Sequence, residues 1–173
     1  MLTSRLAKLS DKSRIFDLYK RVSMNIGGIA RTKDEITEDY ISVNLKNSMN
    51  TGVSLVIENE DATKIIAEIH CYKIIPKVFS HILSELTIVV DADYQKRGLG
   101  KLLFKNLLAI VEEERNDILR IELIARESNL KAIQFYKNLG FKIEGRFENR
   151  IHNLNNSFEA DIPMAWFNKN YKK

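Results

Sequence analysis

The spacing of hydrophobic residues along the chain switches between helical and strand-like periods, which predicts a mixed α/β protein. Apolar side chains recur every three or four positions in segments that we expect to be helices, near 11–25, 34–48, 98–115 and 129–139. Segments rich in β-branched residues predict seven strands, at about 2–9, 52–59, 63–75, 81–91, 118–126, 141–151 and 157–167. This order favours a largely antiparallel sheet with about four helices on its two sides, and Gly27-Gly28 separates the first two helices.

The turn at Asp93–Gly100 carries the clearest chemical signal. It follows an apolar run ending at Val90 and opens the helix expected at 98–115. The first N–H groups of a helix lack a helical partner and the macrodipole adds positive charge, so such a turn favours an anion. Gly98 and Gly100 let the backbone approach that anion, and the neighbouring cations are Lys96, Arg97 and Lys101. The pattern predicts a pyrophosphate site, and it matches neither a Walker loop nor a three-glycine dinucleotide turn.

A second segment, 129–141, reads Asn-Leu-Lys-Ala-Ile-Gln-Phe-Tyr-Lys-Asn-Leu-Gly-Phe. Asn129, or Ser128 beside it, is a candidate N-cap, and Gly140 is suited to end the helix. The three- and four-residue spacing places Asn129, Ala132 and Tyr136 on one helical face.

The Q-x-x-G-x-G pattern at 95–100 and the N-x-x-A-x-x-[FL]-Y-x-x-x-G-F pattern at 129–141 resemble the cofactor segments of the GNAT superfamily of acetyl-CoA-dependent N-acetyltransferases. The resemblance spans about residues 1–168, and the subgroup includes amino-acid, ribosomal-protein and polyamine acetyltransferases. It departs at Asn155-Asn156, where many relatives carry Gly, and at an apparent extra residue between His81 and Glu85. Asparagine tolerates a positive φ, so we expect the hairpin to persist.

The resemblance implies the GNAT fold, in which two central parallel strands splay apart and receive the pantetheine arm of acetyl-CoA beside the strand that ends at Val90. It implies these residues at the cofactor: Ile88, Val89, Val90, Gln95, Lys96, Arg97, Gly98, Leu99, Gly100, Lys101, Asn129, Ala132, Phe135 and Tyr136.

An N-acetyltransferase must deprotonate an amine, stabilise an oxyanion and protonate a leaving thiolate. Tyr136 occupies the family's tyrosine position and is the expected acid. Glu85 is the expected base, and strict alternation would place Glu85, Thr87 and Val89 on one strand face, with Ser84, Leu86 and Ile88 on the other. The family favours a bulge in this strand, and a bulge would make the assignment of faces less certain for the residues that approach Val90.

Several readings stay open. Glu85 also fits a structural role bonded to backbone, and Glu122, His81 or His70 could serve at the amine instead. Glu68, His70 and Tyr72 alternate along one strand face, where a solvated surface is the default and a polar wall facing substrate is the alternative. Cys71 lies on the apolar side and reads as a small core residue.

Composition fits one globular domain over residues 1–173, with 45% hydrophobic residues and a net charge of +4. No apolar run approaches the roughly 20 residues of a membrane span, and the start of the chain lacks a signal-peptide core. A lone cysteine excludes an internal disulfide, so we expect a cytoplasmic protein without membrane partners. The dispersed cations argue against nucleic acid, no residues have metal-ligand spacing, and homodimers are frequent in the family.

The sequence therefore predicts acetyl transfer from acetyl-CoA to a primary amine by direct attack, with a small-molecule amine slightly favoured. The alternatives are a protein or peptide N-terminal acetyltransferase and a catalytically silent acyl-CoA-binding module.

Overall fold

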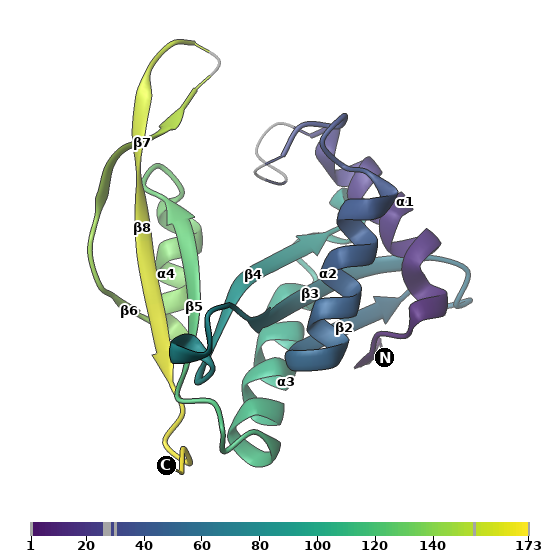
Figure 1. Ribbon diagram of the computed structural model, residues 1–173. Coiled ribbons are helices and arrows are strands. Elements are labelled where there is room, and N and C mark those ends of the chain that lie inside the picture. Colours follow the sequence, from purple (N-terminus) through teal and green to yellow (C-terminus); the bar gives the residue numbers. More distant parts are fainter. Residues whose placement is uncertain (1, 26–28, 30, 154, 173) are drawn as a thin grey trace.

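A computed structural model describes residues 2–25, 29, 31–153 and 155–172. It contains one eight-stranded sheet in the order β1-β2-β3-β4-β5-β8-β6, with β7 paired to β8 (Figure 1). The strands are β1 (Ser4–Leu6), β2 (Val53–Glu58), β3 (Ile65–Lys73), β4 (Ile82–Val90), β5 (Arg120–Arg126), β6 (Lys142–Ile143), β7 (Phe147–His152) and β8 (Phe158–Phe167). The helices are α1 (Lys12–Ser23), α2 (Glu38–Thr51), α3 (Leu99–Glu114) and α4 (Leu130–Asn138).

The sheet splits between β4 and β5, the two neighbours that run parallel. Their register contains Ile82 opposite Arg120 and Leu83 opposite Ile121, and no later pair. Beyond Leu83 the strands diverge, as Figure 1 shows, so that β1–β4 form one wing and β5–β8 the other. The mixed, mostly antiparallel sheet and its splayed central pair confirm the expected fold.

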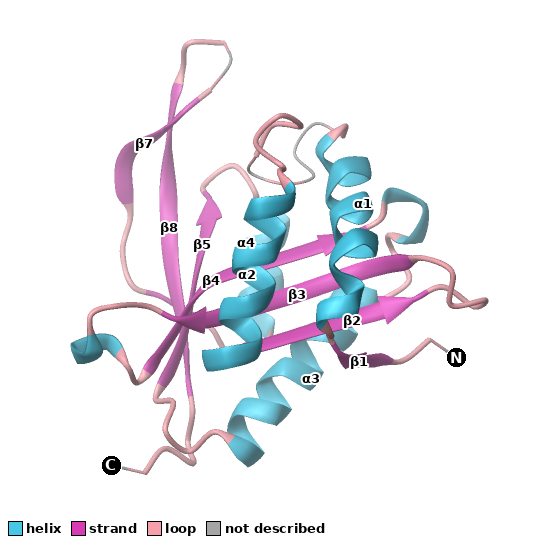
Figure 2. Cartoon of the chain, turned by 45° about the vertical axis from the view of Figure 1, so that its right-hand side comes forward, coloured by secondary structure: helices cyan, strands magenta, loops and turns pink. Residues whose placement is uncertain are grey.

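Two apolar clusters hold the helices on opposite faces. Helices α1 and α2 cover one face of β2–β4 (Figure 2), where Leu18, Ile41 and Val89 are buried together. Helix α3 packs on the other face through the helically spaced Leu99, Leu103, Leu107 and Val111. Helix α4 lies beside β5 and β8, and its Ile133 joins the same cluster as α3.

Two expected elements differ from the observed ones. The strand expected at 141–151 is divided into β6 and β7 around Gly145, which makes the sheet eight-stranded rather than seven-stranded. The helix expected at 34–48 begins after Thr37, whose hydroxyl accepts a hydrogen bond from the Tyr40 amide at 3.0 Å, and it continues to Thr51. The predicted break at Gly27-Gly28 lies outside the described residues.

A β-bulge interrupts β4 at Glu85. Ser84 lies opposite Tyr72 and Thr87 lies opposite His70, so two residues of β4 fill the space of one on β3. Glu85 has a φ of 54° at this bulge, a left-handed conformation that is uncommon for a residue other than glycine. The sequence suggested an extra residue between His81 and Glu85, whereas the register places it one step later, at Glu85 and Leu86. The expected parity is wrong, because Ser84 and Thr87 share the face of Tyr72 and His70.

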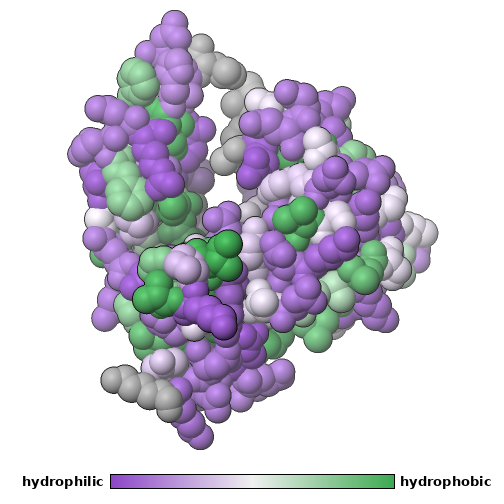
Figure 3. All heavy atoms as spheres, in the orientation of Figure 1, coloured by the Kyte–Doolittle hydropathy of each residue, from purple (hydrophilic) through white to green (hydrophobic). Residues whose placement is uncertain are grey.

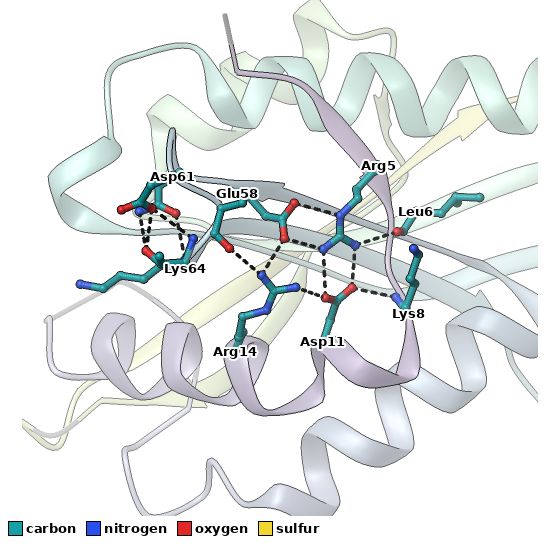
Figure 4. Close-up of polar contacts among 11 residues, drawn as sticks. Arg5, Leu6, Lys8, Asp11, Arg14, Glu58, Asp61 and Lys64 are labelled. Atoms are coloured by element: carbon teal, nitrogen blue, oxygen red, sulfur yellow. Dashed lines mark hydrogen bonds and ion pairs between the residues drawn. The ribbon is translucent and has the colours of Figure 1, made fainter.

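An ion-pair network ties β1, the start of α1 and β2 together (Figure 4). Arg5 donates to Asp11 at 2.7 Å and to Glu58 at 2.8 Å, and Arg14 donates to the same two carboxylates at 2.5 and 2.6 Å. The Asp11 side chain is 1% exposed, so this pairing is what makes its buried charge tolerable.

Within the described part of the chain, every helix is too short or too polar to cross a membrane.

Candidate active site

A cleft of about 550 Å³ occupies the split between β4 and β5. In Figure 3 the surface is hollowed between the β7–β8 hairpin and the region of α1 and α2. Both wings contribute side chains to it: Ile29, Arg31, Tyr40, Asn44, His70, Tyr72, Glu85, Leu86, Thr87, Ile88, Ile124, Ala125, Arg126, Asn129, Ala132 and Tyr136.

A second cleft, of about 430 Å³, continues from the first toward β6 and β7. Glu85, Leu86, Thr87 and Ile124 line both clefts, so the two meet at the β4 bulge. The second cleft also contains Glu122 and other charged side chains beside an apolar wall from β7 and β8. Together the clefts form an open, two-part groove across the molecule.

The turn before α3 has the geometry of an anion site. Lys96 and Gly98 have positive φ values of 61° and 79°, which reverse the chain into the helix. The helical hydrogen bonds of α3 begin with the Leu102 amide, which donates to the Gly98 carbonyl at 3.0 Å. The backbone amides of the first turn therefore have no helical acceptors. Lys96 and Lys101 are exposed, while Arg97 is held over the Tyr94 ring, 4.8 Å from its centroid. These groups fit a pyrophosphate.

The turn adjoins the cleft through Ile88. This side chain lines the cleft, and its Cδ1 lies 3.6 Å from where a β-carbon on Gly100 would stand. The side chain of Val89 is buried under α1 and α2, and that of Val90 packs on the α3 face. The backbone edge of β4 beyond Leu83 is unpaired by β5, so it is available to an extended ligand arm.

Helix α4 supplies the opposite wall. The Asn129 side chain caps the helix by accepting a hydrogen bond from the Ala132 amide at 3.1 Å, and both residues line the cleft. The side chain of Phe135 packs instead on Phe104, with ring centroids 5.6 Å apart, outside the residues that line the cleft.

Tyr136 lines the cleft from within an aromatic cluster. Its ring lies 5.4 Å from the centroid of Phe104 and 6.0 Å from that of Phe141. Burial raises the pKa of the Tyr136 hydroxyl above its ordinary value. The group therefore keeps its proton at neutral pH and is suited to donate it.

The other residues considered as bases occupy different places. Glu85 is exposed where the two clefts meet. Glu122 lines the second cleft and is paired with Arg120 at 3.0 Å. His81 lies outside the residues that line either cleft.

Glu68 and His70 are buried, which corrects the default expectation of a solvated face. They are 2% and 4% exposed because α1 covers this part of β3, and the Tyr19 hydroxyl of α1 donates to Glu68 at 2.7 Å. Alternating polar residues look the same in sequence whether water or a polar helix side chain faces them. The one available signal was Tyr19, a residue with a hydroxyl on the apolar face of α1.

Cys71 is fully buried, and burial raises the pKa of its thiol to about 12. A thiol that remains protonated is a poor nucleophile, which agrees with a core role. Among the described residues, no three His, Cys, Asp or Glu side chains are grouped as metal ligands would be.

A split sheet, a turn with free amides at a helix N-terminus and a cleft lined by Tyr136 together suit an anionic cosubstrate with an extended arm. The sequence profile of the Acetyltransferase (GNAT) family matches residues 16–141. The chain belongs to this family of acetyltransferases, as the sequence predicted.

Known relatives agree with this assignment. The [ribosomal protein bS18]-alanine N-acetyltransferase of Escherichia coli K12 is 43% identical over 87 residues, which are 49% of this chain and 57% of that protein. The chain spans about half the length of the curated relatives it matches.

Solved structures share the fold over nearly the whole chain. A GNAT-family acetyltransferase from Streptococcus pneumoniae superposes with a TM-score of 0.85 at 22% identity, covering 96% of this chain and 99% of that one. The yncA protein of Salmonella typhimurium, solved with its cofactor acetyl-CoA, gives a TM-score of 0.79 at 16% identity, covering 96% and 93%. Acetyl-CoA is the cosubstrate of this family.

Proposed function

We propose that this protein transfers the acetyl group of acetyl-CoA to the N-terminal amine of a protein or peptide. The observation that carries the acceptor class is the 43% identity to the bS18-alanine acetyltransferase. The sequence alone slightly favoured a small-molecule amine. The open two-part groove supports the larger acceptor, because the second cleft continues from the first and offers room for residues that follow the reacting amine.

The described residues suit acetyl-CoA binding. The exposed lysines and the free amides at the start of α3 attract the pyrophosphate. The edge of β4 beyond Leu83 offers backbone groups to the pantetheine amides, and Ile88 joins the two regions. In this arrangement the thioester lies between β4 and Tyr136.

Acetyl transfer then follows as direct attack. The amine nitrogen bonds to the thioester carbonyl carbon, the carbonyl oxygen becomes an oxyanion near the amides of Val89 and Val90, and the C–S bond breaks. Tyr136 donates its proton to the departing thiolate and is reprotonated by a proton that the amine nitrogen loses, which restores the phenol. Glu85, at the junction of the clefts, accepts a proton from the incoming ammonium group.

Free thiol released from acetyl-CoA tests this function directly. The acceptors are a peptide with a free N-terminal alanine, the same peptide with a blocked N-terminus, alanine itself, a polyamine and an aminoglycoside. We expect kcat/KM for the free peptide to exceed that for alanine at least tenfold, with no release from the blocked, lysine-free peptide. The buried Cys71 keeps the background low, and enzyme alone provides the blank.

Release with small amines alone would contradict the proposal and restore the small-molecule acceptor. Binding of acetyl-CoA without release for any amine would instead favour a silent acyl-CoA-binding module.

A further inference from the structure

Glu68 and His70 form a buried polar pair behind the wall of the cleft, which His70 reaches. They lie two residues apart on β3 and therefore on the same face of the sheet, beneath α1. Both are more than nine-tenths buried, yet His70 lines the cleft. A buried carboxylate is costly unless its oxygens receive hydrogen bonds, so its partners indicate what it does.

Three donors surround the Glu68 carboxylate. The Tyr19 hydroxyl donates to Oε2 at 2.7 Å and the Ser54 hydroxyl donates to Oε1 at 3.1 Å. Nδ1 of His70 lies 3.1 and 3.2 Å from the two oxygens. Burial, and then the charge of Glu68, raise the pKa of Tyr19 well above its ordinary value, so the phenol remains a donor.

This network determines the tautomer of His70. A ring nitrogen that bonds a carboxylate carries the proton, which leaves the lone pair of the neutral ring on Nε2. The ring is further fixed by a stacked contact with Tyr72, whose centroid is 6.2 Å away at an interplanar angle of 10°. His70 thus has a defined orientation and one basic nitrogen, as a general base requires.

We propose that Nε2 of His70 accepts a proton from the acceptor amine, and that Glu68 is the positioning residue that holds the imidazole for this step. The proposal rests on the proposed acetyl transfer. His70 and Tyr136 line the same cleft from β3 and α4, so amine and thioester meet between them.

The reaction requires two proton acceptors, so His70 can act in addition to Glu85. An ammonium group that becomes an amide loses two protons, one before and one after the C–N bond forms. The leaving thiolate takes up one proton through Tyr136, and the other is released to solvent. Exposed Glu85 and buried His70 accept these two protons at different depths of one cleft.

The first test compares the pH dependence of kcat in His70→Gln and the native enzyme. A protonated imidazole cannot accept a proton, so we expect native kcat to fall along an acid limb of its pH profile. We expect His70→Gln to lower kcat about 100-fold and to lose this acid limb. Its affinity for acetyl-CoA is unchanged, because β3 does not contribute to the phosphate turn.

Other titratable or charged groups near His70 can also affect the pH dependence of kcat. The titratable or charged side chains that contact the ring or line the cleft with it are Tyr19 on α1, Arg31 before α2, Tyr40 on α2, Glu68 and Tyr72 on β3, Glu85 on β4, Arg126 on β5 and Tyr136 on α4. Glu85→Gln is measured in parallel, and we expect it to retain the acid limb of the kcat profile that His70→Gln loses.

Glu68→Gln separates positioning from stability. Removal of the carboxylate charge destabilises the imidazolium, so the acid limb of kcat moves to lower pH and kcat falls about tenfold. Ser54→Ala is the matched control, because it deletes one hydrogen bond to Glu68 without touching His70. We expect Ser54→Ala to lower the stability of the protein but to leave the acid limb of kcat at the same pH.

A second measurement is independent of any acceptor. The chain has three histidines, so ¹⁵N NMR with His70→Gln for assignment reads the tautomer of His70 directly. We expect the Nδ1–H tautomer at pH 8 in the native protein and its loss in Glu68→Gln. Inactivity of the native enzyme toward peptides would refute the proposed function alone. An Nε2–H tautomer, or a His70→Gln enzyme with kcat within threefold of native and an unchanged limb, would overturn the role of His70.

Discussion

The side chain of Ile88 connects the cleft to the start of α3: it lines the cleft, and its Cδ1 is 3.6 Å from where a β-carbon at Gly100 would lie. Chain direction explains the contact, since β4 ends at Val90 and the turn returns directly into α3. The proposed anion site and the β4 wall of the cleft are therefore joined in one continuous strand–turn–helix segment.

Gly98→Asp tests the anion site at the start of α3. Gly98 has a φ of 79° and its position is open, with no heavy atom within 4 Å of an added β-carbon. A carboxylate there repels the pyrophosphate, so we expect acetyl-CoA affinity to fall at least 100-fold by calorimetry. Gly98→Ala is the control, with a backbone cost of about 1 kcal/mol and affinity within fivefold. Equal affinity for the Asp and Ala variants would exclude this turn as the phosphate site.

Tyr136→Phe tests the acid. The phenyl ring retains its packing on Phe104 and Phe141, so stability changes by less than about 1 kcal/mol. Without the hydroxyl proton, kcat falls about 100-fold while the Kd for acetyl-CoA stays within twofold. Stopped-flow turnover and calorimetry measure the two quantities. Unchanged turnover would remove Tyr136 from the reaction.

Asp11→Asn tests the ion-pair network of β1, α1 and β2. Burial raises the Asp11 pKa, but hydrogen bonds from Arg5, Arg14 and the Lys8 amide outweigh it and lower the pKa from 3.8 to about 2. A depressed pKa in the folded state stabilises the fold above about pH 4, and this contribution is lost as the pH falls toward 2.

The native protein should therefore exceed Asp11→Asn in unfolding free energy by about 2 kcal/mol at pH 6. The difference should narrow between pH 4 and 2 in urea titrations. Glu113→Gln, an exposed change on α3, is the control and stays within about 0.5 kcal/mol. A difference that does not depend on pH would show that the Asp11 charge is not the cause.

Gly52→Ala tests the close approach of β2 and β3. A β-carbon at Gly52 would lie 1.9 Å from the Cys71 carbonyl oxygen and 2.6 Å from Tyr72 Cα. Both are backbone atoms, so the strands must separate, at a cost of about 3 kcal/mol. Gly145→Ala, whose nearest neighbour is a side-chain atom 3.8 Å away, costs less than about 1 kcal/mol. Chemical denaturation of the two variants gives the comparison.

Features that depend on residues close together in the chain could be predicted from the sequence. The glycine-bearing turn before α3 and the capping role of Asn129 depend on residues close together in the chain, and both are confirmed. Asn156 has the positive φ, 59°, that its residue type allows, so the hairpin tolerates an asparagine there.

Features that depend on distant segments were not readable. The family resemblance favoured a bulge in this strand, but its position at Glu85 appears only in the register of β4 against β3. Burial of the Glu68–His70 pair depends on Tyr19, which lies 49 residues from Glu68 in the chain. The division of β6 from β7 depends on their separate pairing with β8.

The most direct test of the central claim is to locate the transferred acetyl group. A peptide with a free α-amine at its first residue and one internal lysine is incubated with the enzyme and acetyl-CoA, then sequenced by tandem mass spectrometry. The proposed function predicts a single acetyl group on the α-amine and none on the lysine. An acetyl group on the lysine alone, or an unmodified peptide in a preparation that acetylates small amines, would contradict it.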